Sequence, residues 1–250
     1  MAGEWIRRLG PPADRPGAVQ LVCFPHAGGA AGAYTALCRA LAPTVEVVGV
    51  QYPARQDRLR EEPVRDVRGL AERVARELGE DAGSARPRAF FGHSMGALVA
   101  FETALLLGRD GPATRPVRLF LSGRAAPSLG PGPSDHLAGD AELLAELRRL
   151  GGVGDGVLED PDVVELIMPA VRADYQALAA YSWRPGTTLD RPLTVLVGDT
   201  DPIVTREGAA QWRRLSTAPT EVRSFTGGHF YLDDRVQQVA EVVRDALVRP

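Results

Sequence analysis

Short apolar runs recur along the chain, and segments with helical periodicity separate most of them. The runs cover residues 19–24, 45–50, 88–91, 117–122, 193–198 and 220–225. Runs this apolar leave no face for solvent, which is typical of a mostly parallel sheet with helices on both faces. The helical segments cover residues 33–41, 66–78, 95–107 and 234–248. The alternation predicts an α/β fold, and 250 residues suit a single domain, residues 1–250.

The alternation stops between residues 127 and 185. A stretch rich in Gly and Pro leads there into two segments with apolar residues at helical spacing, residues 141–150 and 161–181. Helices inserted between two strands of such a sheet are expected to form a cap, or lid, over the carboxyl ends of the strands, where open α/β sheets bind ligands. The alternative is that these helices only extend the core.

The composition excludes several kinds of chemistry. The sequence contains no Lys and no Asn, so a lysine Schiff base, a Walker A lysine and a Cys-His-Asn triad are ruled out. The four His and two Cys are not at zinc-ligand spacing, so we expect no metal site. Cys23 and Cys38 lie in apolar sequence and are expected to be buried thiols.

The charge and hydropathy of the sequence bear on possible binding partners and on the location of the protein. A net charge of −3 without long runs of one sign gives no reason to expect nucleic acid or a membrane surface as a partner. The first 15 residues contain no continuous apolar stretch, and the most apolar run, residues 95–107, is too short to span a membrane. We therefore expect a cytoplasmic protein.

The most specific motif is a G-x-S-x-G at residues 92–96, with an apolar strand before it and an apolar helix after it. This context is what the nucleophile elbow of the α/β-hydrolase fold requires. Gly92 and Gly96 have no Cβ to obstruct the approach of strand and helix, so Ser94 is expected on a strained turn with its hydroxyl exposed. Ser94 is the predicted nucleophile, and the N–H of Met95 is a predicted oxyanion donor.

A serine hydroxyl is a weak nucleophile, so a base is needed, and in this fold the base comes last in the order Ser, acid, His. Two His follow Ser94 in the chain. His136 lies in the predicted lid with no strand before it, whereas His229 follows the predicted strand 220–225 in a loop with two Gly. His229 is therefore the predicted base.

The acid that orients the base is expected directly after a strand between Ser94 and His229. Two carboxylates follow the predicted strand 193–198. Asp201 precedes a Pro, which biases its backbone toward an extended turn that can project the side chain back along the sheet. Asp199 is better placed to accept from a backbone N–H. Asp201 is the predicted acid, and Asp199 is the alternative.

A second oxyanion donor is expected from the loop after the first long strand. Gly28 and Gly29 make this loop adaptable, and we choose the N–H of Ala27, with that of His26 as the close alternative. A phosphate-binding loop is not expected here, because the segment lacks a Lys and the G-x-G-x-x-G spacing.

With these residues identified, the chain resembles the type II thioesterases that accompany modular polyketide synthases and nonribosomal peptide synthetases. The likeness covers nearly the whole chain. Besides the elbow it rests on Phe24-Pro-His-Ala-Gly-Gly29, Gln51-Tyr-Pro-Ala-Arg55, Leu121-Ser-Gly-Arg124, Leu147-Arg-Arg-Leu-Gly-Gly152, Arg172-Ala-Asp-Tyr175 and Gly227-Gly-His-Phe230. The chain departs from the family at Ala54, where Gly is usual after Tyr-Pro, and this concerns only the local turn.

The resemblance implies hydrolysis of acyl thioesters held on the phosphopantetheine arm of a carrier protein, which removes stalled or misprimed acyl groups. It implies Ser94, Asp201 and His229 as the triad, and the N–H groups of Met95 and Ala27 as oxyanion donors. The lid would shape a narrow apolar slot for pantetheine and a short acyl group. The expected partners are acyl or peptidyl carrier protein domains, no metal or redox cofactor is needed, and we expect a free-standing monomer.

Two alternatives remain at this point. A general carboxylesterase or lipase would use the same fold and triad, because triad chemistry alone does not separate oxygen esters from thioesters. A noncatalytic carrier-protein binding module would keep the fold but lack a member of the triad, and none is missing in this sequence.

Overall fold

The computed structural model describes residues 4–14, 17–80, 86–109, 111, 114–152 and 156–248. In this part of the chain, seven strands form one sheet in the order β1-β3-β2-β4-β5-β6-β7. Neighbouring strands are parallel except β1 and β3, which are antiparallel. The mostly parallel sheet is therefore confirmed. The strands are β1 (Ile6–Arg8), β2 (Gln20–Phe24), β3 (Glu46–Val50), β4 (Arg88–His93), β5 (Leu119–Ser122), β6 (Leu193–Gly198) and β7 (Thr220–Phe225).

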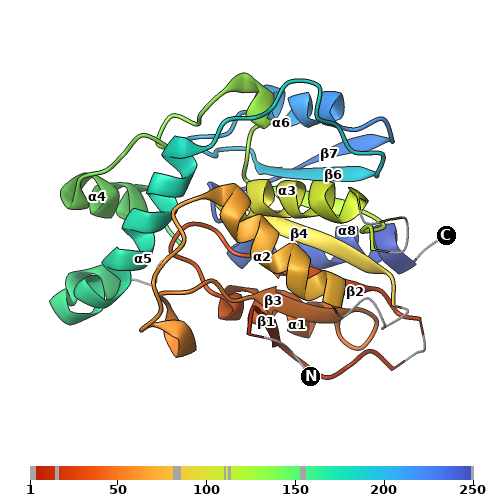
Figure 1. Ribbon diagram of the computed structural model, residues 1–250, viewed down its shortest axis with the longest axis horizontal. Coiled ribbons are helices and arrows are strands. Elements are labelled where there is room, and N and C mark those ends of the chain that lie inside the picture. Colours follow the sequence, from red (N-terminus) through yellow and green to blue (C-terminus); the bar gives the residue numbers. More distant parts are fainter. Residues whose placement is uncertain are drawn as a thin grey trace.

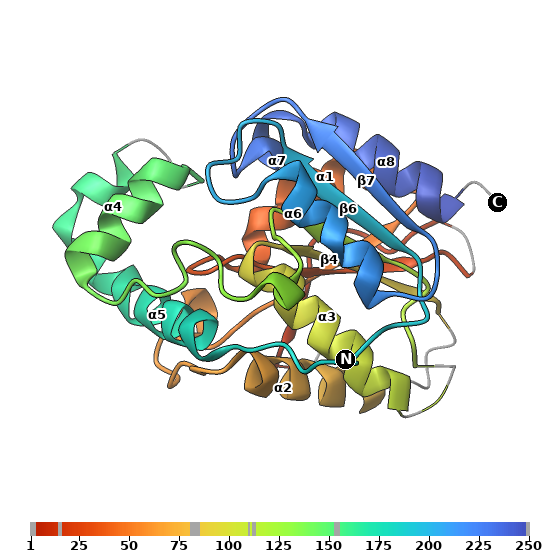
Figure 2. The same ribbon diagram turned by 90° about the horizontal axis from the view of Figure 1, so that it is seen from above.

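Helices cover both faces of the sheet, as Figures 1 and 2 show. Helices α2 and α3 pack together on one face, and α1 and α8 pack on the other. These four helices lie where the periodicity predicts them, with small differences at their ends. The helices outside the lid are α1 (Thr35–Leu41), α2 (Val67–Glu80), α3 (Met95–Arg109), α6 (Arg206–Ala210), α7 (Tyr231–Asp234) and α8 (Val236–Val248).

The central strands are buried on both sides because their residues alternate between two apolar clusters. On β2, Val22 and Phe24 belong to the cluster under α2 and α3, whereas Leu21 and Cys23 belong to the cluster under α1 and α8. Burial on both faces explains why these strands appear in the sequence as continuous apolar runs. Cys23 and Cys38 are both free and buried, as expected.

The structure differs from the sequence analysis at both edges of the sheet, with one strand missed and one prediction wrong. Strand β1 was not predicted, because its three residues include Arg7 and Arg8 and no apolar run marks it. Its pairing with β3 holds it in place. Strand β7 was expected to be buried on both faces, but only Phe225 is buried and Arg223 and Ser224 are exposed. An edge strand has a neighbour on one side only, so polar side chains there can reach solvent.

The two inserted helices, α4 (Asp140–Leu150) and α5 (Pro161–Ala180), lie between β5 and β6 in the chain. We call the described residues of 127–185 the lid, and they contain no strand. Figures 1 and 2 both place α4 and α5 beyond one end of the sheet and not on its faces. Asp174 of α5 accepts a hydrogen bond from Gly28, shortly after β2, so this is the carboxyl end of the strands. The inserted helices therefore form a lid, as expected.

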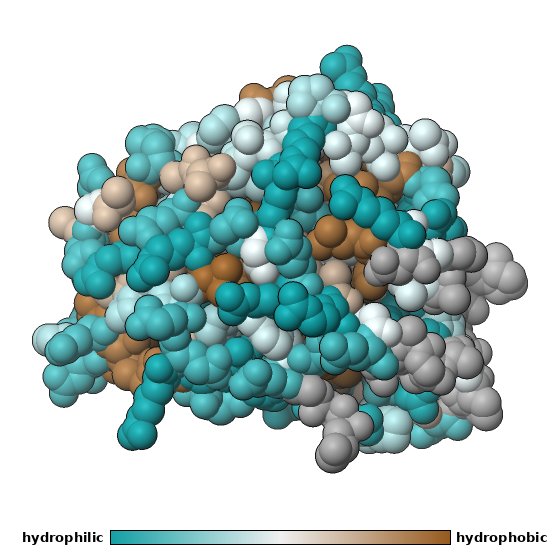
Figure 3. All heavy atoms as spheres, in the orientation of Figure 1, coloured by the Kyte–Doolittle hydropathy of each residue, from teal (hydrophilic) through white to brown (hydrophobic). Residues whose placement is uncertain are grey.

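The face of the molecule in Figure 3 is mostly hydrophilic, and apolar side chains gather on it in small groups, some of them over the lid. Leu166 and Val157 are the large apolar residues of α5 and its preceding turn that are most exposed, at 50% and 40%. No helix in the described part of the chain is long and apolar enough to cross a membrane.

Candidate active site

The G-x-S-x-G turn joins β4 to α3 at the carboxyl end of the sheet. Ser94 has a φ of 54°, in the left-handed region that residues with a Cβ rarely occupy. Its N–H donates to the carbonyl of Ser122 at 2.8 Å, and the residue is half-buried. Backbone strain of this kind is found at functional turns. The strained turn that the sequence predicts is thus present.

Two glycines allow the turn to be this tight. A Cβ on Gly92 would lie 2.2 Å from the carbonyl oxygen of Gly96, and a Cβ on Gly96 would lie 2.0 Å from the carbonyl oxygen of Phe24. These neighbours are backbone atoms, so a side chain at either position has no room. The close approach also brings the N-terminus of α3 against the end of β2, where the loop of residues 26–29 follows. We call residues 26–29 the glycine loop.

Asp201 and His229 form a hydrogen-bonded pair. Oδ2 of Asp201 lies 2.8 Å from Nδ1 of His229, and both side chains are almost completely buried. Oδ1 of Asp201 accepts from the N–H groups of Ile203 at 2.9 Å and Val204 at 3.2 Å. The carboxylate is therefore fixed on both oxygens, with one of them directed at the imidazole.

The alternative residues from the sequence lie elsewhere. Asp199 accepts from the backbone N–H of Gly227 at 3.0 Å, which is the kind of contact expected for it, and does not bond His229. This contact ties the end of β6 to the loop that carries His229. His136 is exposed in the lid. The structure thus brings Asp201 to the imidazole of His229 and leaves Asp199 and His136 away from it.

The elbow lies close to this pair. His93 directly precedes Ser94, and its ring centre is 4.9 Å from that of His229. Within the described residues, the Ser94 hydroxyl and Nε2 of His229 have no hydrogen-bond partner, so the bond expected between them is not formed here. Catalytic hydrogen bonds often tighten only when substrate binds. Proton transfer from Ser94 to His229 stays a prediction.

Some backbone N–H groups in and near the glycine loop donate hydrogen bonds within the protein, and others have no acceptor in the described part of the chain. Gly28 donates its N–H to Asp174, at 2.7 Å, and Gly29 donates to the carbonyl of His26, at 2.9 Å. The N–H groups of His26, Ala27 and Met95 have no acceptor among the described residues. Their donation to an oxyanion stays a prediction for Met95 and Ala27, with His26 as the alternative to Ala27.

Neutral histidines surround His229. Burial, and then the charges of His229 and Arg55, lower the pKa of His26 to about 3. Burial, followed by the charges of His229 and His26, lowers the pKa of His93 well below its ordinary value. Nδ1 of His93 lies 2.9 Å from the hydroxyl of Ser122. These imidazoles are therefore uncharged near neutral pH and do not compete with His229 for its carboxylate.

Sequence reasoning missed two residues that contact the glycine loop. Arg55 and Asp174 stand in two of the segments that resemble the family, but neither had a role assigned from the sequence. In the structure Asp174 accepts from Gly28, and Arg55 donates to the carbonyl of Gly29 at 3.0 Å. The feature that identifies the two residues is their pairing as buried opposite charges, and this pairing is known only once the lid is placed over the sheet.

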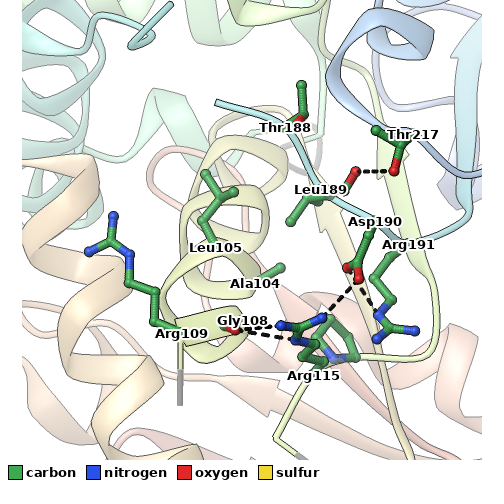
Figure 4. Close-up of a pocket in the computed structure, with 11 residues that line it drawn as sticks. Ala104, Leu105, Gly108, Arg109, Arg115, Thr188, Leu189, Asp190, Arg191 and Thr217 are labelled. Atoms are coloured by element: carbon green, nitrogen blue, oxygen red, sulfur yellow. Dashed lines mark hydrogen bonds and ion pairs between the residues drawn. The ribbon is translucent and has the colours of Figure 1, made fainter. Parts of the chain in front are cut away.

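A hollow of about 360 Å³ lies at the other end of the sheet, and Figure 4 shows the side chains around it. Arg115 reaches across it to Asp190, at 2.8 Å, and Asp190 also pairs with Arg191 at 3.5 Å. Asp190 and Arg191 lie shortly before β6, so the hollow lies at the amino end of the strands and not beside Ser94. The described residues contain no cluster of three or more His, Cys, Asp or Glu that could hold a metal ion.

Known proteins resemble the chain over nearly its whole length. A family model for the thioesterase domain matches residues 19–247. The thioesterase PikA5 of Streptomyces venezuelae is 42% identical over 247 residues, which cover 99% of this chain and 86% of that protein.

Solved structures agree with this match. The type II thioesterase BorB from the borrelidin biosynthetic cluster has a TM-score of 0.87 and 41% identity, with 99% of each chain covered. YbtT, a type II thioesterase from the yersiniabactin NRPS/PKS biosynthetic pathway, has a TM-score of 0.86 and 29% identity, with 97% of this chain and 98% of that chain covered. The similarity therefore includes the lid as well as the sheet.

Proposed function

Because this chain belongs to the thioesterase family, we propose that it hydrolyses acyl thioesters carried on the phosphopantetheine arm of carrier proteins and so removes stalled or misprimed acyl groups from a synthase. The observation that carries the proposal is the match to the type II thioesterase BorB over 99% of both chains. Substrate selection in this fold depends on what covers the carboxyl ends of the strands, and the match extends over that part.

In the proposed mechanism, Ser94 is the nucleophile. Its Oγ bonds to the thioester carbonyl carbon while its proton passes to Nε2 of His229, and Asp201 stabilises the imidazolium that forms. The carbonyl oxygen becomes an oxyanion that accepts from the N–H groups of Met95 and Ala27. The C–S bond then breaks, and the sulfur takes the proton from His229.

Hydrolysis of the acyl-serine repeats these steps with water. His229 takes a proton from the water as its oxygen bonds to the acyl carbon, and the proton is returned to Oγ of Ser94 as the ester bond breaks. Every step uses side chains, backbone N–H groups or water, so the proposal includes no metal or redox cofactor. The free acid leaves, and the carrier keeps its thiol.

The proposed partners are acyl or peptidyl carrier protein domains. The relation to YbtT, whose pathway is of the NRPS/PKS kind, supports this class of partner. The expected monomeric state and cytoplasmic location stay predictions.

The test compares substrates that differ in one feature. We expect the purified enzyme to hydrolyse a short acyl group from a phosphopantetheinylated carrier protein with a higher kcat/KM than the matching p-nitrophenyl ester. Mass spectrometry of the intact enzyme should find the acyl group on Ser94.

A strong preference for the oxygen ester would instead favour a general carboxylesterase. Undiminished hydrolysis by a Ser94→Ala variant would refute the nucleophile, and binding of the carrier without any turnover would indicate a noncatalytic module.

A further inference from the structure

A buried ion pair joins the lid to the sheet domain next to the predicted oxyanion site. Arg55 follows β3, and Asp174 lies in α5. Nη1 of Arg55 is 2.8 Å from Oδ2 of Asp174, and Nη2 is 3.1 Å from Oδ1. The two side chains are only 7% and 1% exposed. The guanidinium and the carboxylate therefore meet as a bidentate pair that fixes both position and orientation.

The same two side chains hold the backbone of the glycine loop. Oδ2 of Asp174 accepts from the N–H of Gly28 at 2.7 Å, and Nη1 of Arg55 donates to the carbonyl of Gly29 at 3.0 Å. The Gly28 N–H belongs to the peptide unit that directly follows Ala27. Fixing this unit limits how far the backbone at Ala27 can rotate, and so limits the direction of the Ala27 N–H.

Arg55 is itself held in a strained segment. Its Nε donates to the carbonyl of Pro53 at 3.1 Å, and its carbonyl accepts from the side chain of Gln51 at 3.2 Å. The residues on either side, Ala54 and Gln56, have φ values of 65° and 50°. Non-glycine residues keep such values only where the surroundings enforce them. The position of the guanidinium is therefore closely specified.

Holding the lid in place does not by itself require an ion pair. Burying two charges costs desolvation free energy that their attraction only partly offsets, and a well-packed apolar pair often stabilises a fold as well or better. An apolar pair could not, however, accept from the N–H of Gly28 or donate to the carbonyl of Gly29. The chemistry of Arg55 and Asp174 thus fits a role in orienting this backbone.

We propose that Arg55 and Asp174 are positioning residues that keep the N–H of Ala27 directed at the oxyanion, and so couple the seating of lid helix α5 to catalysis. The inference rests on the proposed function, because it takes Ala27 as an oxyanion donor. A donor that acts on the oxyanion stabilises the transition state more than the bound substrate. Loss of the pair therefore lowers kcat and leaves KM nearly unchanged.

The test uses Asp174→Asn beside a matched control. Asp135 also lies in the lid and forms a buried bidentate pair, with Arg124 after β5, but it does not contact the glycine loop. Asp135→Asn therefore reproduces the loss of a buried lid-to-sheet ion pair. For both variants, kcat and KM are measured on an acyl-N-acetylcysteamine thioester, and stability is measured by urea unfolding. The affinity for an alkylboronic acid is measured as well, because its serine adduct places an oxygen at the oxyanion site.

We expect Asp174→Asn to lower kcat and boronic acid affinity together by roughly 10- to 100-fold, with KM within about threefold. Asp135→Asn is expected to lose comparable stability while keeping kcat within about threefold. Arg55→Lys keeps a buried positive charge but loses the fork, so it provides the second variant if Asp174→Asn does not fold, and its kcat should fall in the same range.

Two results would overturn the inference. One is a wild-type kcat and boronic acid affinity in Asp174→Asn or Arg55→Lys. The other is an equal loss in Asp135→Asn, which would assign the effect to general loosening of the lid. These measurements need no carrier protein. If the enzyme cleaves the soluble thioester but not a carrier-bound one, the proposed substrate class fails and the result on Arg55 and Asp174 still stands.

Discussion

The way in which Asp201 uses its two carboxylate oxygens selects one tautomer of His229. Oδ2 lies beside Nδ1, so the ring carries its hydrogen on Nδ1 and leaves Nε2 free to accept a proton. Oδ1 accepts from the N–H groups of Ile203 and Val204, which holds the plane of the carboxylate so that its other oxygen faces the ring. The orientation of the carboxylate is thus restrained by backbone groups as well as by the histidine.

Asp201→Asn is expected to lower kcat by about 10⁴-fold without loss of the fold. The amide oxygen should stay on the N–H groups of Ile203 and Val204, so the amide NH₂ faces Nδ1 of His229. The ring hydrogen then moves to Nε2, which can no longer accept a proton from Ser94. Steady-state kinetics on a soluble thioester measures the loss, and circular dichroism checks the fold.

The matched control is Asp199→Asn, since Asp199 follows the same strand but only accepts from the N–H of Gly227. We expect this variant to keep kcat within about tenfold of wild type, because it leaves the tautomer of His229 unchanged. If Asp199→Asn loses more activity than Asp201→Asn, the assignment of the acid is wrong.

At Ala54 one residue departs from what its family usually has. The structure gives Ala54 a φ of 65°, a conformation that Gly adopts without a steric penalty. Ala54 has a Cβ and therefore adopts this conformation with some strain. Its neighbour Arg55 reaches Asp174 all the same.

At the scale of elements, the packing of α3 against β4 and the end of β2 leaves the least room for side chains. Helix α3 packs so closely on the sheet that ten of its residues are buried, and its first turn lies against the end of β2. The apolar character of the helix on all sides follows from this position, because a helix enclosed by a sheet and other helices has little solvated face.

Two glycines of α3 should therefore respond in opposite ways to alanine. Gly96→Ala would place a Cβ 2.0 Å from a backbone carbonyl oxygen, and we expect it to destabilise the protein by about 3 kcal/mol or more, or to prevent folding. At Gly108 the nearest atom to an added Cβ is in the side chain of Arg115, at 4.0 Å. Gly108→Ala should stabilise by about 0.5–1 kcal/mol because alanine favours the helix.

Urea unfolding of the two variants measures both effects, and soluble yield is a first indication for Gly96→Ala. Equal stabilities for the two variants would contradict the close approach of α3 to β2. A loss of activity in Gly108→Ala without loss of stability would show that this end of the helix takes part in function.

At the scale of the whole molecule, stability depends on pH through histidines that the fold keeps neutral. His93 is fully buried, and its pKa lies well below the ordinary value of 6.5 because of burial and of the charges of His229 and His26. The unfolded chain takes up a proton near pH 6.5, whereas the folded protein does not. The unfolded state therefore gains protons as the pH falls, and folding becomes less favourable below about pH 6.5.

We expect the free energy of unfolding to decrease from pH 6.5 to pH 5, with at most about 1.4 kcal/mol per pH unit from each neutral histidine. His26, with a pKa of about 3, adds to the effect in the same direction. His93→Asn keeps an amide near the position of Nδ1 and cannot titrate, so its stability should depend less on pH. Urea unfolding across this range tests the expectation, and identical slopes for the two proteins would contradict it.

The lid contributes to the whole molecule by closing the carboxyl end of the sheet with apolar and ionic contacts. Leu143 and Val171 belong to the same apolar cluster as the strands. Buried pairs of Arg124 with Asp135 and of Arg55 with Asp174 cross between the lid and the loops after the strands. Two buried ion pairs, one of which touches the glycine loop, thus hold the lid, together with hydrogen bonds from Tyr181 to Glu102 and from Arg68 to the carbonyl of Ser182.

The sequence by itself determined the parallel sheet, its covering helices, the elbow around Ser94 and the choice of Asp201 and His229 as a pair. The sheet, its helices and the elbow depend on apolar runs and turn residues, which are patterns over a few residues, whereas the pair was chosen from the order Ser, acid, His along the chain. Strand β1 and the exposure of β7 could not be predicted from such patterns. A strand lies at an edge because it lacks a neighbour on one side, and the local sequence does not specify which strands become neighbours.

Only the tertiary structure decided that Arg55 and Asp174 meet at the glycine loop. They are 119 positions apart, and nothing in either segment specifies the other as its partner. Their pairing arises because the lid folds over the carboxyl ends of the strands and buries both charges, and a buried charge must find an opposite one. Local sequence preferences determine which residues form helices and strands. The free energy cost of removing charged groups from water during packing determines which polar groups pair.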